Sequence, residues 1–281
     1  MTRNMLIQPF LKWAGGKRQL LKEIEKYIPT KFSTYYEPFL GGGAVLFNLQ
    51  HKKAIVNDSN QELINAYKVI RDNVDELIKD LKKHENTAEY FYFLREKDRT
   101  SEYSNLSNVE RASRLIYLNK TCYNGLFRVN SQGEFNTPYG NYKNPNIVNE
   151  YVLRSVSNYL NKNDIKFLEG DFEDALKNIR KGAFVYFDPP YMPISDSSSF
   201  TGYTLDGFTM DDQIRLKVLC DKLDERGIKF LLSNSTAPII LDLYKDYKIE
   251  FVNAKRAINS IGKKRGEIKE VLIMNYGYEK W

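Results

Sequence analysis

The sequence has few of the residues that build metal sites and disulfide frameworks. Its 281 residues include two cysteines, Cys122 and Cys220, and two histidines, His51 and His84, and no HExxH motif occurs. Two isolated cysteines form neither a disulfide framework nor a zinc-ligand spacing, which is typical of a reducing compartment. We therefore expect no metal site, no catalysis based on histidine, and a cytoplasmic protein.

Long apolar runs are also missing. No apolar segment approaches the roughly 18 residues of a membrane span, and the N-terminal residues lack the apolar stretch of a signal peptide, so we expect no membrane partner. The hydrophobic content of 42% is sufficient for one large α/β domain, or a core domain with an insertion. The net charge of +6 permits a polyanionic partner without requiring one. Aromatic residues, at 14%, suit base stacking when they lie among basic residues.

One stretch near the N-terminus predicts a βαβ unit. A strand at 35–40 (YYEPFL) runs into Gly41-Gly42-Gly43, a helix follows, and a second strand at 53–57 ends at Asp58. Glycines allow a tight turn and the close approach of a ligand, and an acid after the next strand can accept hydrogen bonds from ribose hydroxyls. The glycines fit neither GxGxxG nor GxxxxGK[ST], so the pattern favours a nucleoside cofactor other than NAD or a nucleoside triphosphate.

The middle of the chain interrupts this α/β pattern. Charged helices are predicted at 61–83, 88–97 and 109–121, followed by a polar, aromatic stretch at 122–146 with hairpin chemistry. From 149 the pattern returns, with predicted helices at 149–161 and 173–180. We predict a discontinuous domain at 1–60 and 149–281 that binds a cofactor and carries catalysis, interrupted by an insertion at 61–148.

Two further stretches have residues suited to chemistry. In FLKWAGGK (10–17), Lys17 could neutralise a carboxylate and Trp13 could pack against a planar ligand, although a plain loop is the alternative. Residues 183–187 read as a buried strand that ends at Asp188 and two prolines. Such an ending can be a simple stop signal or a functional loop, and this window admits both.

Five motifs, taken in order, decide between these alternatives. FLKWAGGK, EPFLGGGAVLF, VNDSN, GDF (170–172) and DPPY (188–191) occur with the insertion between the glycine motif and DPPY. In this order the chain resembles the Dam-type alpha group of DNA adenine-N6 methyltransferases, close to the GATC-specific modification methylases. The similarity runs through essentially the whole chain and includes YNGLFRVNSQGEFNTPYG inside the insertion.

The resemblance implies a fold and an activity. The fold is a Rossmann-like sheet of an S-adenosylmethionine-dependent methyltransferase, with an inserted, mainly helical DNA target recognition domain that contains a hairpin. The activity is site-specific transfer of a methyl group from S-adenosylmethionine to N6 of a flipped-out adenine in double-stranded DNA, within GATC. A restriction endonuclease is a possible associated partner.

For the cofactor, the resemblance implies a set of binding residues. Trp13 and Lys17 would border it, with Lys17 at the methionine carboxylate, and Asp58 would hold the ribose hydroxyls. Asp171 would lie near the adenine, although capping of the following helix is an alternative role. Asp188 would lie close to the methyl-donor site. The floor beneath the methionine part would consist of Glu37, Pro38, Phe39, Gly41, Gly42 and Gly43.

The DPPY tetrad would form the catalytic clamp. Adenine N6 is a poor nucleophile because its lone pair is delocalised into the ring. Asp188 and the Pro189 carbonyl can each accept an N6–H hydrogen bond and favour a localised lone pair. Pro190 adds rigidity, and Tyr191 offers a face on which a flipped base can stack. No metal is required, because the methyl group of a sulfonium is already an electrophile.

The insertion would read the DNA. Arg128 could bond guanine O6 and N7, and Leu126 and Pro138 could touch a thymine methyl group. The other expected contacts are Lys12 at another guanine, Tyr123 in the gap left by the flipped base, Asn124 in the hairpin and Lys143 at a phosphate. Asn141 stands where many family members have arginine, which weakens a phosphate contact there, and we expect Phe127 to pack rather than to read bases.

Two other functions compete with this interpretation. A cytosine-N4 methyltransferase uses the same amino-group chemistry but more often has serine first in the tetrad, so Asp188 argues against it. A DNA-binding relative without turnover is disfavoured by the intact set of cofactor and catalytic positions.

Overall fold

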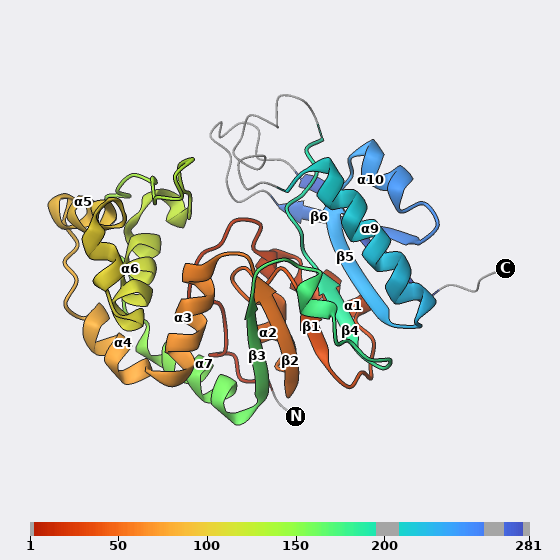
Figure 1. Cartoon of the computed structure of the whole chain (residues 1–281), viewed down its shortest axis with the longest axis horizontal. Helices are drawn as coiled ribbons and strands as arrows, with labels where there is room; N and C mark the ends of the chain where they lie inside the picture. The colour runs from red at the N-terminus through yellow and green to blue at the C-terminus, as the bar shows by residue number, and fades with distance from the viewer. Residues whose placement is uncertain (1–2, 195–207, 256–266, 278–281) are drawn as a thin grey trace. The chain divides into compact units, whose positions relative to one another are not determined.

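The computed structural model describes residues 3–194, 208–255 and 267–277 (Figure 1). The chain divides into two compact units. Unit 1 comprises Met1–Gly16, Gly41–Lys52 and Asp58–Gly170. Unit 2 comprises Lys17–Leu40, Lys53–Asn57 and Asp171–Trp281. The FLKWAGGK segment is therefore divided between the two units after Gly16.

The strands form one seven-stranded sheet in the order β3-β2-β1-β4-β5-β7-β6. β1 pairs in parallel with β2 and β4, and β4 pairs in parallel with β5, whereas β7 is antiparallel to both β5 and β6. This topology confirms the expected Rossmann-like α/β sheet. The strands are β1 (Tyr35–Glu37), β2 (Lys53–Asp58), β3 (Asp164–Glu169), β4 (Phe184–Phe187), β5 (Lys229–Ser235), β6 (Lys248–Lys255) and β7 (Glu267–Met274).

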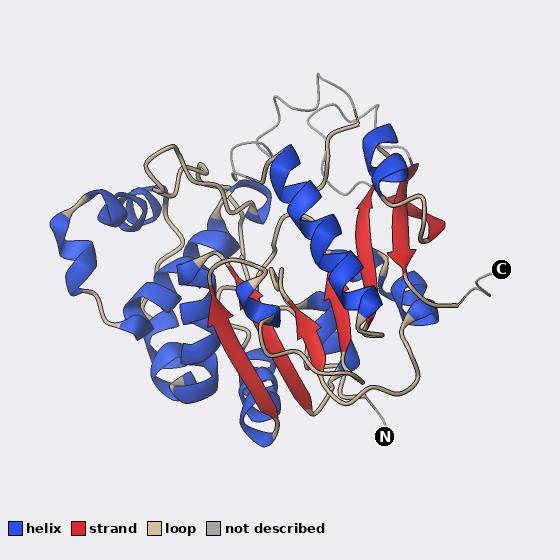
Figure 2. Ribbon diagram, turned by 45° about the vertical axis from the view of Figure 1, so that its right-hand side comes forward, coloured by secondary structure: helices blue, strands red, loops and turns tan. Residues whose placement is uncertain are grey.

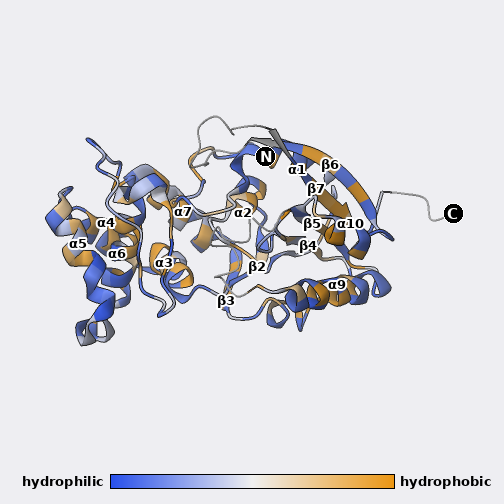
Figure 3. Ribbon diagram, turned by 90° about the horizontal axis from the view of Figure 1, so that it is seen from above, coloured by the Kyte–Doolittle hydropathy of each residue, from blue (hydrophilic) through white to orange (hydrophobic). Residues whose placement is uncertain are grey.

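The core of unit 2 lies around β4 and β5. All four residues of β4 are fully buried, as expected of a short, continuous apolar run in a parallel sheet. Helix α9 (Met210–Glu225) packs along β5 and contributes Leu216, Cys220 and Leu223 to the same core (Figure 2). It carries both apolar and polar residues (Figure 3) and begins at a capping box between Thr209 and Asp212. These contacts hold the backbone in place where β4 ends.

The sheet changes its direction of winding between β1 and β4. After β1 the chain adds β2, whereas β4 lies on the other side of β1 and is followed by β5. In open α/β sheets, ligands bind outside the carboxyl ends of the strands at such a switch point. The carboxyl ends of these two neighbouring strands are Glu37 and Phe187, and Asp188 follows directly.

Some short segments differ from the prediction. The expected helix at 173–180 is wrong, because this segment forms the 3-10 turn η5 (Asp174–Leu176) and further turns closed by bonds between residues three apart. So short a segment gains few helical hydrogen bonds, and burial of its apolar residues decides its path. The remaining short elements of unit 2 are η1 (Lys17–Gln19), α1 (Leu21–Tyr27) and α10 (Pro238–Leu243).

Unit 1 is mainly helical. The predicted helical segment at 61–83 is two helices, because Asn73 leaves the helical region with φ −136° and ψ 41°. Helix α6 packs against α3, α4 and α5, and α3 also packs against α7. The helices are α2 (Ala44–Leu49), α3 (Gln61–Asp72), α4 (Val74–Leu81), α5 (Ala88–Glu96), α6 (Asn108–Thr121) and α7 (Glu150–Lys162), with short 3-10 turns η2 (Lys97–Arg99), η3 (Ser101–Asn105) and η4 (Tyr123–Gly125).

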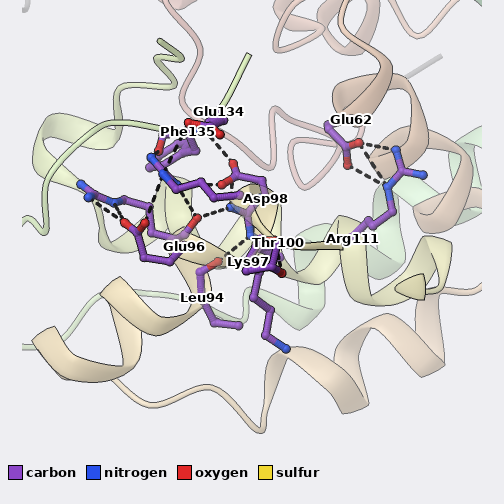
Figure 4. Close-up of polar contacts among 12 residues, drawn as sticks. Glu62, Leu94, Glu96, Lys97, Asp98, Thr100, Arg111, Glu134 and Phe135 are labelled. Carbon is purple, nitrogen blue, oxygen red and sulfur yellow. Dashed lines mark hydrogen bonds and ion pairs between the residues drawn. The ribbon is translucent and has the colours of Figure 1, made fainter. Parts of the chain in front are cut away.

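A hairpin follows α6 and is anchored by charged side chains (Figure 4). Isolated bridges pair Cys122 with Tyr139 and Val129 with Phe135. Asp98 Oδ2 accepts a hydrogen bond from the Phe135 N–H at 2.8 Å and lies 2.9 Å from Arg114 Nη2. The Asp98 and Arg114 side chains are 11% and 8% exposed, so this pair is largely removed from water. The base of the hairpin is thereby fixed to the helices.

We expect Asp98→Ala to lower the free energy of unfolding by about 3 kcal/mol, because it leaves the buried Arg114 guanidinium without this carboxylate. Asp75→Ala is the matched control, since Asp75 pairs with Arg154 while 73% exposed. The loss of that pair should cost less than about 1 kcal/mol. Urea denaturation measures both values, and an equal loss in the two variants would contradict the anchoring role of Asp98.

Candidate functional site

In unit 2, the end of β4 carries a buried ion pair. Asp188 follows Phe187 directly, and its side chain is 19% exposed. Lys17 begins η1 and is 5% exposed, and its Nζ lies 2.8 Å from Asp188 Oδ1. A lysine at this depth needs a counter-charge, because an unpaired buried ammonium is costly. The structure thus brings together a predicted residue of the first motif, FLKWAGGK, and one of the last motif, DPPY.

The Asp188 carboxyl titrates close to neutrality. Burial raises its pKa to about 6, while the Lys17 ammonium and the nearby Tyr191 hydroxyl act to lower the pKa, and Glu270 acts to raise it. The group is consequently ionised at pH 8 and protonated well below pH 6. An ionised carboxylate in a partly dry environment is a strong hydrogen-bond acceptor.

Two contacts fix the Tyr191 side chain, one at its hydroxyl and one at its ring. Its hydroxyl donates to Glu270 Oε2 at 2.7 Å, and Lys17 Nζ lies 4.6 Å from its ring centroid, in a cation–π arrangement. Burial raises the pKa of Tyr191 well above its ordinary value, so the hydroxyl remains a donor. The sequence analysis missed Glu270, which begins the apolar run EVLIM, because nothing in that run indicates Tyr191 as its partner.

The residues expected beneath the methionine part begin where β1 ends. Glu37 is 2% exposed and accepts a hydrogen bond from the Tyr35 hydroxyl at 2.9 Å. The Pro38 carbonyl accepts from Asn57 Nδ2 at 3.1 Å, and the Phe39 ring stacks on Phe172 with centroids 5.2 Å apart. These bonds hold the segment after β1 in one path, beside β4 in the sheet.

Asp171 is the most exposed acid among the expected cofactor residues. Its side chain is 41% exposed, and its carboxylate pairs with Arg215 at 3.0 Å and accepts from the Glu173 N–H at 2.9 Å. The bond to Glu173 closes a turn before η5 and caps no helix, because the expected helix at 173–180 is absent and η5 has no side-chain cap. A place beside the cofactor's adenine stays a prediction for this residue.

In unit 1, the glycine motif forms a tight turn tied to Asp58. Gly41 and Gly43 have φ of 49° and 68°, in the left-handed region. A Cβ at Gly41 would lie 2.9 Å from Trp13 Cδ1, and one at Gly43 would lie 2.6 Å from the Tyr67 hydroxyl oxygen. Asp58 Oδ2 accepts from the Gly41 N–H at 2.8 Å. Glycine is therefore required at 41 and 43, and the turn keeps bare backbone between Trp13 and Asp58.

The segment before Gly15 is joined to the hairpin that follows α6. Asn119 Oδ1 accepts from the Lys12 N–H at 2.9 Å, and Asn119 Nδ2 donates to the carbonyls of Lys12 and Gly125 at 2.8 and 3.0 Å. Trp13 stacks on Phe127, with centroids 4.8 Å apart and planes inclined at 20°. Phe127 thus packs, as expected, and it packs on a residue assigned to the cofactor. Sequence reasoning missed Asn119, whose position in a buried helix carries no motif.

The hairpin presents polar and aromatic side chains to solvent. Asn124 and Gly125 both have positive φ, 58° and 64°, which makes a tight turn. Tyr123 is 58% exposed. Arg128 is exposed, and its Nε donates to Asn136 Oδ1 at 2.7 Å. Of the other residues expected at DNA, Lys12, Pro138 and Lys143 are exposed and Leu126 is half-buried. Their contacts with bases and phosphates stay predictions.

The described part of the chain offers no metal centre and no membrane span. Within residues 3–194, 208–255 and 267–277, no three His, Cys, Asp or Glu residues are grouped so that they could hold a metal ion. No helix in these ranges is long and apolar enough to cross a membrane.

Comparison with known proteins gives a consistent assignment. The model of the D12 class N6 adenine-specific DNA methyltransferases matches residues 13–258. The chain is 48% identical to the type II methyltransferase M1.LlaDCHI of Lactococcus lactis subsp. cremoris, over 96% of each chain. It is 46% identical to the type II methyltransferase M.MjaIII of Methanocaldococcus jannaschii, over 97% of this chain and all of that one (100%). A DNA adenine methylase of Escherichia coli is 34% identical over 94% of each chain. The protein belongs to the D12 class of N6 adenine-specific DNA methyltransferases.

Proposed function

We propose that the protein transfers a methyl group from S-adenosylmethionine to N6 of a flipped-out adenine in double-stranded DNA, within the sequence GATC. The observation that carries the proposal is the carboxylate of Asp188, which stands at the end of β4 with Lys17 as its counter-charge and Pro189, Pro190 and Tyr191 behind it. Membership of an adenine-specific family supports adenine over cytosine as the target.

The chemistry follows from what these groups can accept and hold. Asp188 and the Pro189 carbonyl each accept one N6–H hydrogen bond, and both bonds strengthen as N6 becomes pyramidal and its lone pair localises. The proline rings fix the backbone and hence the carbonyl direction. Tyr191, whose hydroxyl is held by Glu270, offers its ring to the extruded base. When bound, S-adenosylmethionine supplies a methyl group that its sulfonium makes electrophilic.

The residues present fit that cofactor. The turn at Gly41 and Gly43 has no room for side chains, because Trp13 and Tyr67 pack against it, while Gly41 and Gly42 are only half-buried and their bare backbone suits close approach of a ligand. Asp58 offers a carboxylate fixed beside that turn, a suitable acceptor for two ribose hydroxyls. We assign Trp13, Lys17 and the segment from Glu37 to Gly43 to the methionine part, and Asp171 to the adenine.

Recognition of the DNA sequence is assigned to the insertion at 61–148 as a separate domain. Arg128, held by Asn136, is a rigid donor fork that suits guanine O6 and N7. Lys12, Tyr123, Asn124, Leu126 and Pro138 complete the proposed readout, and Lys143 contacts phosphate. Two of the relatives are named as type II methyltransferases, which supports a modification role beside a restriction endonuclease of the same specificity.

The direct test is expression in a host without DNA methylation. Plasmid from expressing cells should resist an endonuclease that cuts only unmethylated GATC, and digestion to nucleosides should yield N6-methyladenine. N4-methylcytosine instead would establish the alternative amino-methyltransferase. If the plasmid contains N6-methyladenine but is still cut, the GATC specificity is wrong and the methyltransferase activity stands. If no modified base is found, the alternative of a DNA-binding relative without turnover is favoured.

The pH dependence of turnover tests Asp188. Because the ionised form accepts the N6–H bond and its pKa is about 6, the single-turnover rate should fall as pH decreases through about 6. Lys17 lowers this pKa, so Lys17→Met should move the acid limb to higher pH at saturating cofactor. Lys26→Met is the control, since Lys26 is 59% exposed and pairs with Glu23. An acid limb that Lys17→Met leaves in place would contradict the assignment.

Cofactor affinity tests Asp58. Asp58→Asn should weaken S-adenosylmethionine binding by about 1.5–3 kcal/mol, the contribution of a hydrogen bond to a charged group. Calorimetry without DNA measures the affinity. Asp72→Asn alters an acid that pairs with the neighbouring Arg71 and is 49% exposed, and it should bind the cofactor normally. Equal affinities in the two variants would remove Asp58 from the cofactor site.

Sequence choice tests Arg128. A bidentate arginine–guanine contact contributes about 1–3 kcal/mol of discrimination, so Arg128→Ala should relax preference at one guanine–cytosine pair and keep the others. Lys143→Ala should instead weaken binding to all sequences alike and flatten its salt dependence. Methylation rates on substrates altered at each GATC position distinguish the two. A uniform loss in Arg128→Ala would contradict base readout by this residue.

A further inference from the structure

Two buried amide side chains lie behind the DPPY tetrad in unit 2. Gln213 is in the first turn of α9 and is 1% exposed, and Asn234 is near the end of β5 and is fully buried at 0%. Burial of an amide costs free energy unless its donors and acceptors are hydrogen-bonded. Neither residue belongs to the motifs of the sequence, and the methyl-transfer chemistry above uses neither.

The hydrogen bonds of these amides end on the backbone on both sides of Tyr191. Gln213 Nε2 donates to the Pro190 carbonyl at 3.0 Å, and Asn234 Nδ2 donates to Gln213 Oε1 at 3.2 Å. Asn234 Oδ1 accepts from the Met192 N–H at 3.2 Å. We call this chain of hydrogen bonds through Gln213 and Asn234 the relay. It connects Pro190, the residue before Tyr191, to Met192, the residue after it.

Ser235 completes the relay. Its Oγ donates to the Met192 carbonyl at 2.5 Å, and its N–H donates to Asn234 Oδ1 at 2.8 Å. The segment needs such outside partners, because Pro189 and Pro190 lack the N–H groups with which a turn normally closes on itself. Side chains of α9 and β5 supply the bonds that the backbone of the tetrad cannot make.

The direction of the relay requires amides. Gln213 must donate to Pro190 and accept from Asn234 at once, and Asn234 must donate to Gln213 while it accepts from two N–H groups. An ionised carboxylate at either position could accept but not donate, and an aliphatic side chain could do neither. This requirement accounts for an amide side chain at each of these two buried positions.

We propose that Gln213 and Asn234 are positioning residues that hold the tetrad in the geometry that methyl transfer needs. They fix the Pro190 carbonyl and the Met192 N–H, and Ser235 fixes the Met192 carbonyl, so the backbone that carries Pro189 and Tyr191 is held in place. The role rests on the proposed function of Asp188, Pro189 and Tyr191. A displacement of about 1 Å at reacting groups costs on the order of 100-fold in rate.

The test compares Gln213→Met and Asn234→Leu with the control Asn275→Leu. Asn275 makes the same kind of contacts at the other end of β5, where it accepts from the Phe230 N–H and donates to Asp224 and the Ile228 carbonyl. Single-turnover methylation should slow by about 10–100-fold in the first two variants, with affinities for S-adenosylmethionine and DNA close to those of wild type. Asn275→Leu should lower the melting temperature and keep the rate.

Two further readouts separate positioning from general destabilisation. The double variant Gln213→Met/Asn234→Leu should be no slower than the slower single variant within about threefold, because the two residues act as one unit. Hydrogen exchange in the peptide 188–194 should be faster than in wild type for both single variants and unchanged in Asn275→Leu.

Each outcome bears on one proposal. Wild-type rates in the folded variants, multiplicative losses in the double variant, or unchanged exchange at 188–194 would overturn the positioning role. Wild-type protein without any methylation of adenine would overturn the proposed function, whereas the exchange measurement does not depend on activity.

Discussion

The candidate site in unit 2 depends on the ion pair between Lys17 and Asp188. Both charges are largely removed from water, and each would be costly without the other. The pair therefore ties the start of η1 to the end of β4, and it keeps a carboxylate ionised near neutral pH where burial acts against ionisation. A carboxylate maintained in this way is available as an acceptor without reorganisation, which is how preorganised enzymes stabilise developing charge.

The tetrad after β4 depends on side chains for its rigidity. Two consecutive prolines restrict its backbone but remove donors, so its conformation is completed from outside. Glu270 on β7 holds the Tyr191 hydroxyl, and Gln213 on α9 holds the Pro190 carbonyl. A strand and a helix that lie far along the chain, β7 and α9, thus converge on these four residues.

Unit 1 places exposed residues on a buried scaffold. Asp98, paired with Arg114, anchors the hairpin at Phe135, and Asn119 binds both Lys12 and Gly125. The side chains that this hairpin presents, among them Tyr123 and Arg128, are exposed, while their backbone groups are hydrogen-bonded to Pro138 and Asn136. Binding residues on loops held by a rigid scaffold are a common arrangement, because the scaffold reduces the ordering cost of recognition.

Local chemistry was readable in the sequence. The glycine turn, the acid that ends β2, the buried strand β4 and the tetrad after it follow from residue types a few positions apart, and the order of the motifs led to the fold and family. The left-handed φ of Gly41 and the burial of β4 agree with those expectations. The contacts of the predicted site residues with cofactor and DNA stay predictions, because those contacts involve molecules other than this chain.

Tertiary structure decided what has no local signature. Asn119 binds Lys12 across 107 residues of sequence, Glu270 binds Tyr191 across 79, and Gln213 binds Pro190 across 23. The break at Asn73 and the turns at 173–180 likewise follow packing rather than periodicity. A periodic pattern records which face of an element is apolar, whereas the partner of a buried polar group is set by how distant elements pack, and its hydrogen bonds form only once that packing excludes water.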